Sequence, residues 1–81
     1  MRSLIVRADW DDEAKVWVAT STEIDGLAVE ADTLEALSRK VELAVAELIE
    51  LNGLPAGSDG TGDVPVHIMA ERLFRVPVST G

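Results

Sequence analysis

Residues 32–53 read DTLEALSRKVELAVAELIELNG, and the spacing of their apolar side chains is the strongest structural signal in the chain. Its apolar side chains recur at spacings of three and four, as on a helix with one buried face. Asp32 with Glu35 three positions later, or alternatively Thr33, can cap the start, and Asn52-Gly53 supplies a stop. The segment predicts one helix of about 20 residues, with Leu43 exposed opposite the apolar stripe. The stripe consists of Leu34, Leu37, Val41, Ala44, Val45, Leu48 and Leu51.

Three segments before the helix alternate with a period of two, which is typical of strands. The first runs from Leu4 to Trp10, and the charged residues 11–14 that follow it predict a hairpin turn. The second strand extends from Lys15 to about Thr20. Residues 21–26 form a loop rich in turn formers, and residues 27–31 form a short third strand.

The chain after the helix begins with residues 54–63, whose glycines and polar side chains predict a flexible loop. From Val64 the β-like alternation resumes and persists through Val78. At about 3.3 Å per residue this segment reaches roughly 50 Å, against about 25 Å for the first strand. Residues 72–81 should therefore extend beyond the sheet.

The order of these elements predicts one α+β domain over residues 1–81, an antiparallel β-β-β-α-β sheet of four strands with the helix on one face. On this interpretation the helix covers Leu4, Val6, Trp10, Val16, Val18, Leu27, Val29, Val66 and Ile68. The opposite face then carries Ile5, Trp17, Ala19, Ala28, His67 and Met69.

A sheet with one uncovered face favours binding to another protein. Tryptophan, histidine and methionine among charged side chains are typical of interfaces, so Trp17, His67 and Met69 are the candidate partner contacts. The alternative for Trp17 is simple half-burial against its neighbours.

The predicted extension favours self-association. Leu73, Phe74 and Val76 would need cover, and we expect them to pair across subunits in a homodimer or a higher homo-oligomer. The alternative is a frayed terminal tail.

Composition excludes several function classes. Fifteen acidic and seven basic residues give a net charge of -8, so a nucleic-acid backbone should be repelled and a basic protein attracted. No cysteine is present, which removes disulfides and thiolate chemistry. No apolar run approaches the roughly 20 residues of a membrane span, and no signal peptide is evident, so a cytoplasmic location is expected.

Candidate catalytic groups are few. His67 is the only histidine, and no triad or zinc partners can be identified for it. The carboxylates from Asp9 to Glu13 are better explained as a solvated hairpin tip than as a two-metal site. Residues 57–63 lack both the lysine of a phosphate loop and the closing glutamate of a calcium loop. We therefore expect no enzyme activity, no cofactor and no metal.

The run from Trp17 to Leu37, with Gly26 after the second strand and Asp32-Thr33-Leu34-Glu35-Ala36 at the helix start, resembles the HicB-like antitoxin domain. The similarity covers about residues 4–52, and residues 64–76 fit the final strand more loosely. Asp25 stands where the family usually has proline. Longer relatives carry a DNA-binding segment that these residues do not include, so direct operator binding is not expected.

The resemblance implies a partly degenerate ribonuclease-H-like fold without catalytic acids. It also implies that the chain binds and covers a small basic RNA-cleaving toxin of the HicA type. A homo-oligomeric adaptor without a toxin partner is the alternative function.

Overall fold

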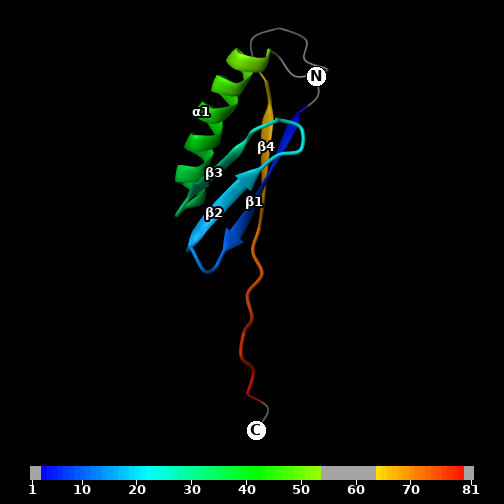
Figure 1. Cartoon of the computed structure of the whole chain (residues 1–81). Coiled ribbons are helices and arrows are strands. Elements are labelled where there is room, and N and C mark those ends of the chain that lie inside the picture. Colours follow the sequence, from blue (N-terminus) through cyan, green and yellow to red (C-terminus); the bar gives the residue numbers. More distant parts are fainter. Residues whose placement is uncertain (1–2, 54–63, 80–81) are drawn as a thin grey trace.

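The computed structural model describes residues 3–53 and 64–79 (Figure 1). The elements follow in the order β1 (Leu4–Asp11), β2 (Val16–Thr20), β3 (Ala28–Ala31), α1 (Leu34–Asn52) and β4 (Val66–Glu71). The predicted α+β class and the β-β-β-α-β order are confirmed. The loop predicted over residues 54–63 lies outside the described residues.

The strands form one sheet in the order β3-β2-β1-β4. β2 is antiparallel to β1 and to β3, whereas β4 lies parallel to β1, so the sheet is mixed and mostly antiparallel. The reason is the helix between β3 and β4. A crossover helix returns the chain to the end at which β3 began, so β4 runs parallel to β3. Because β3 and β1 are both antiparallel to β2, they point the same way, and β4 is therefore parallel to β1 as well.

The turn between β1 and β2 fixes the register of the sheet. Residues 12–15 form the turn, because Asp11 pairs with Val16. The Asp11 carbonyl accepts the Lys15 N–H at 2.8 Å, and its carboxylate accepts the N–H groups of Glu13 and Ala14 at 3.1 and 3.2 Å. Lys15 closes the turn with a φ of 58°. Trp10 consequently lies opposite Trp17.

This register corrects the predicted faces of β2. Residues directly opposite each other in a ladder share a face, so Trp17 and Ala19 lie on the same side as Trp10 and Ala8. Val16 and Val18 therefore lie on the other side, and their predicted placement under the helix is wrong. The predicted faces of β2 came from alternation within the strand, which does not tell which of its two sides matches the buried side of β1; the pairing across the turn does.

The core lies between α1 and one face of the sheet. The helix contributes Leu37, Val41 and Val45, the centre of the predicted stripe, whereas Leu34 and Leu51 at its two ends are exposed. Leu43 is exposed as predicted, at 68%. The remaining buried apolar residues are Leu4, Val6, Ala8, Ala19, Ile24, Leu27 and Ala31.

Local hydrogen bonds fix the helix ends and the loop before β3. Thr33, the alternative cap, is the N-cap, and its hydroxyl accepts the Ala36 N–H at 3.1 Å. Gly53 ends the helix with a φ of 84° and donates its N–H to the Ile49 carbonyl. At the other end of the sheet, Ser21 donates to the Ile5 carbonyl and Glu23 accepts the Ile5 N–H, both at 2.8 Å. The side chains of Ser21 and Glu23 thus bond the backbone C=O and N–H of Ile5 at the part of β1 that extends beyond its pairing with β2.

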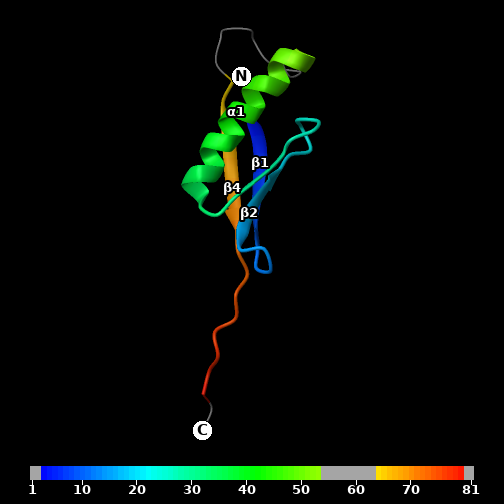
Figure 2. The same cartoon turned by 60° about the vertical axis from the view of Figure 1, so that its left-hand side comes forward.

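Residues 72–79, here named the C-terminal arm, continue from β4 in an extended conformation and project away from the sheet (Figures 1 and 2). The arm makes the molecule 61 Å long, against 23 and 19 Å along its other axes. Among the residues predicted to extend beyond the sheet, 72–79 belong to no strand, and residues 80 and 81 lie outside the described residues.

Leu37 should be the most sensitive position of the helix. Its side chain is fully buried, so Leu37→Ala is expected to lower the free energy of unfolding by about 2–5 kcal/mol through lost burial and a residual cavity. Leu43→Ala, on the exposed side of the same helix, is the matched control and should cost less than about 1 kcal/mol. Urea unfolding followed by circular dichroism measures both. Equal losses would contradict the packing described here.

Asp12 offers a test of the hairpin turn. The Lys15 ammonium donates a hydrogen bond to its carboxylate at 3.1 Å and the Trp10 indole donates another at 3.2 Å, and both lower the pKa of Asp12. A lowered folded-state pKa stabilises the fold above the ordinary value of about 3.9. That contribution is lost as the pH falls through the folded-state pKa.

Carbon-detected NMR titration should therefore show Asp12 ionising below its ordinary range. Lys15→Ala should raise its pKa toward that range. Lys40→Ala, which removes an ammonium bound to the Glu30 carbonyl, should not. A pKa unchanged by Lys15→Ala would mean that the turn is not formed in this way.

Candidate protein-interaction surfaces

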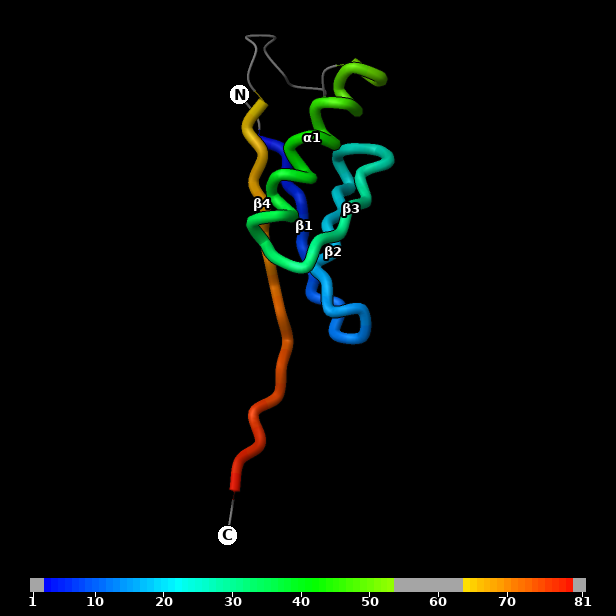
Figure 3. The backbone as a smooth tube through the Cα atoms, turned by 90° about the vertical axis from the view of Figure 1, so that its left-hand side faces the viewer, coloured from blue at the N-terminus to red at the C-terminus, as the bar shows by residue number. Residues whose placement is uncertain are grey.

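The helix covers only part of one face of the sheet. α1 packs against β3 and β2, and Figure 3 shows it in front of the sheet. Beside it, a groove of about 640 Å³ separates the helix from the inner side of β4. The apolar residues Val41, Val45 and Ile49 form one wall, and Val66 and Ile68 form the other. Ser38, Glu42, Ala46, Glu50 and Val64 complete the lining.

The face opposite α1 has no helix over it among the described residues. Strand pairing places its side chains in rows that cross all four strands. One row holds Glu30, Val18, Asp9 and Glu71, and we name it the acidic row. The next row holds Ala28, Thr20, Arg7 and Met69. Neighbouring strands lie about 4.8 Å apart, so the acidic row spans roughly 14 Å.

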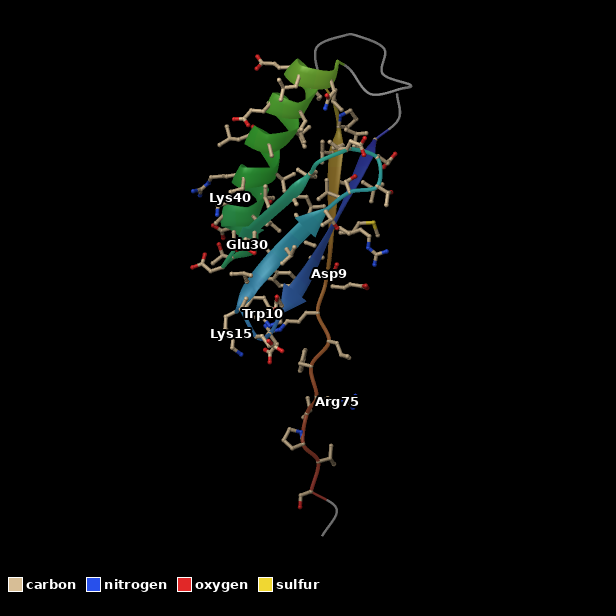
Figure 4. The ribbon with its side chains drawn as sticks, viewed as in Figure 1. Asp9, Trp10, Lys15, Glu30, Lys40 and Arg75 are labelled. Atoms are coloured by element: carbon tan, nitrogen blue, oxygen red, sulfur yellow. The ribbon has the colours of Figure 1, made fainter. Side chains whose placement is uncertain are left out.

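The acidic row presents carboxylates in three of its four positions. Figure 4 labels two of them, Glu30 and Asp9. Arg7 forms an ion pair with Glu71 at 3.1 Å. Both side chains are more than 60% exposed, so this pair is screened by solvent and contributes little to stability. The row continues toward the hairpin, where Asp9, Asp11, Asp12 and Glu13 line a shallow hollow together with Trp10, Val18 and Thr20. The surface is thus predominantly negative.

An aromatic pair lies at the hairpin end of the helix side. The rings of Trp10 and Trp17 meet edge to face, with centroids 5.4 Å apart and planes at 63°. The Arg72 guanidinium lies 4.6 Å from the centroid of the Trp10 ring, within the range of a cation–π interaction. This contact holds the first residue of the arm against β1. Trp17 is partly buried against the core.

The three predicted partner contacts do not form one cluster. His67 and Met69 alternate with Val66 and Ile68 along β4, so they lie on the face opposite α1 and are exposed there. Trp17 lies on the helix side, so its predicted placement beside them is wrong. The alternative named for Trp17, half-burial against its neighbours, agrees with its packing against the core. A contact role for His67 and Met69 stays a prediction.

The predicted oligomerisation residues lie together on the arm. Leu73, Phe74 and Val76 are 85%, 69% and 67% exposed. Within residues 3–53 and 64–79, no strand pairs with the arm. Their role in self-association stays a prediction.

Two features of the surface were missed by sequence reasoning. The acidic row depends on the register of four strands, which alternation alone does not supply. The groove depends on where the helix lies across the sheet. Its only sequence signal is Ala46, a small side chain beside the apolar stripe.

The described part of the chain contains neither a metal-binding cluster nor a membrane-spanning helix. No group of three or more histidine, aspartate or glutamate side chains there could hold a metal ion. In the same residues, no helix is both long and apolar enough to cross a bilayer.

Comparison with known proteins places the chain in a family. No curated protein matches it. A crystal structure of a hypothetical protein from the extremely thermophilic bacterium Thermus thermophilus is similar, with 42% sequence identity and a TM-score of 0.66 over 95% of this chain and 100% of that one. A family model described as a domain of unknown function, DUF1902, matches residues 3–79. The chain therefore belongs to the DUF1902 family.

Proposed function

We propose that this chain is a non-catalytic protein-binding domain of the HicB-like antitoxin type. Its partner would be a small basic RNA-cleaving toxin of the HicA type, bound so that its active surface is covered. The observation that carries the proposal is the acidic row on the sheet face that no helix of the described residues covers. The sequence resemblance to HicB-like antitoxins, through Gly26 and the helix start at residues 32–36, supports it.

The chemistry of this face suits a basic polypeptide. Carboxylates of Glu30, Asp9 and Glu71 line up across the sheet, with exposed Met69 and His67 beside them. An interface of this kind combines apolar contact at its centre with charge pairs at its rim. Because the whole chain carries a charge of -8, long-range attraction would also speed the encounter with a basic protein.

An RNA-cleaving partner must itself bind phosphate, so its active surface is expected to be basic. An acidic face that competes for that surface can inhibit without any reaction of its own. Inhibition of this kind requires no nucleophile, metal or cofactor. It requires only that the carboxylates are held on a rigid support, which the paired strands provide.

A homo-oligomeric adaptor is the second candidate. The observation in its favour is the exposed apolar arm. The two functions are compatible in one molecule, because the arm and the acidic row occupy different surfaces.

Charge reversal on the acidic row tests the proposal. The chain is co-expressed with a basic protein of about 60–80 residues, the size of a HicA-type toxin, encoded by a neighbouring reading frame. Asp9→Lys with Glu30→Lys should weaken the complex at least about tenfold, because like charges would face each other across the interface. Isothermal calorimetry and rescue of growth from the toxin measure the effect.

The matched control is Glu35→Lys with Glu47→Lys, which makes the same change in net charge at exposed positions of α1. We expect it to change affinity less than about threefold, through long-range attraction alone. Equal weakening by both double variants would reject the acidic row as the docking surface. A basic neighbour that never co-purifies with the wild-type chain would reject the antitoxin function.

A further inference from the structure

The C-terminal arm is an exposed apolar segment that leaves the sheet. Leu73, Phe74, Val76 and Val78 are all exposed large hydrophobic residues. Figure 4 shows Arg75 of this arm well beyond the end of β4. A run of apolar side chains in extended backbone is a ready partner for a sheet edge.

The groove and the free edge of β4 lie side by side. β4 is the last strand of the sheet, and its inner side chains Val66 and Ile68 line the groove. The Leu4 N–H donates to the Pro65 carbonyl at 2.9 Å, which sets the phase of the β1–β4 ladder. In a parallel ladder alternate residues bond to each side, so Val66, Ile68 and Ala70 turn their backbone groups toward the free edge.

We propose that the arm of a second copy of this chain occupies the groove and pairs antiparallel with the free edge of β4. Exchange of the two arms in this orientation is two-fold symmetric, and it closes a homodimer. The inference does not depend on the basic partner proposed above, because the groove and the acidic row lie on opposite faces of the sheet.

The alternation of the arm fits this orientation. In extended backbone, Phe74, Val76 and Val78 share one face and Pro77 belongs to the other. In an antiparallel ladder, a residue that bonds to the backbone groups of Val66 or Ile68 has its side chain on the same face as theirs. If the arm directs Phe74 and Val76 into the groove, the backbone N–H and C=O groups of Phe74 and Val76 therefore point toward β4. Pro77 then points away from β4, where a missing N–H costs no hydrogen bond. In a parallel strand the same apolar face would turn Pro77 toward β4, so the antiparallel orientation is favoured.

The arm leads away from its own groove. To return, the chain would have to reverse within the first residues after Glu71, where Arg72 and Leu73 offer none of the usual turn chemistry. The contact between Arg72 and the Trp10 ring instead holds the start of the arm in the direction of β4, past the β1–β2 hairpin. A second copy reaches the groove without such a reversal.

Charge also favours a second copy. Arg72 and Arg75 give the arm a charge of +2 and it contains no acid, so with -8 for the whole chain the remaining residues carry -10. Glu42 and Glu50 lie along the groove, where they can attract the two arginines of the arm.

The area of the proposed interface is also sufficient. A buried phenylalanine alone removes about 150–250 Å² from water, and symmetry doubles each contact. Two arms of this length can therefore approach the roughly 1,200 Å² of a stable interface.

Analytical ultracentrifugation of the full chain tests the proposal. The wild type should sediment as a dimer, and Phe74→Asp should raise the dimer dissociation constant at least about 100-fold, because a charge would enter the apolar groove. Leu73→Asp places the same charge on the outer face of the arm and should change it less than about fivefold. A monomeric wild type, or equal effects of the two variants, would overturn the proposal.

The groove is tested from the other side. Ala46 is an exposed residue of α1 that lines the groove, so Ala46→Arg should block the arm and leave the fold intact by circular dichroism. Mixing this variant with Phe74→Asp restores one intact arm and one intact groove, and a heterodimer should form between two chains that are each monomeric alone. A dimer that survives Ala46→Arg, or a mixture that stays monomeric, would contradict the exchange of arms.

Discussion

The hydrogen bonds that Asp11 makes across the turn decide which side of the sheet faces the helix. By closing a turn over residues 12–15, they pair Asp11 with Val16 and place the Trp10 and Trp17 rings together on the helix side. Through β2 and β3, the same register aligns Glu30 with Asp9 on the other side, and the separate β1–β4 ladder adds Glu71. The core and most of the acidic row thus depend on this turn. A turn one residue longer or shorter would reverse β2 and β3 against β1, mixing charged and apolar side chains on both faces.

A second constraint is that one helix cannot cover four strands. α1 lies over β3 and β2, so the inner side of β4 faces a groove and its outer edge has no neighbouring strand among the described residues. The molecule is therefore left with two surfaces of different chemistry, one carboxylate-rich and one apolar. The first suits a basic polypeptide and the second suits the apolar arm of an identical chain. Both proposed functions would consist of docking, and neither would require a reacting group.

Local periodicity was sufficient to predict the elements and their order. The helix, its Gly53 stop and the exposure of Leu43 follow from spacing along one segment, and the overhanging arm follows from the length of the final extended run. The faces of β2 follow from the parity of the turn and not from alternation. A four-residue turn, predicted over residues 11–14 and observed over residues 12–15, pairs odd-numbered residues of β2 with even-numbered residues of β1, and the faces predicted from alternation did not use this parity. For the same reason Trp17 was grouped with His67 and Met69. The parallel direction of β4, the acidic row and the groove all depend on contacts between residues distant in sequence.

Hydrogen exchange along β4 tests whether another polypeptide covers the free edge of the sheet and the groove beside it. His67 and Met69 should be protected in dilute and concentrated solution alike, because the ladder phase turns their N–H groups toward β1. Val66, Ile68 and Ala70 face the free edge, so their N–H groups should exchange quickly in dilute solution and become protected as concentration rises. Fast exchange of these three residues at every concentration would contradict the account.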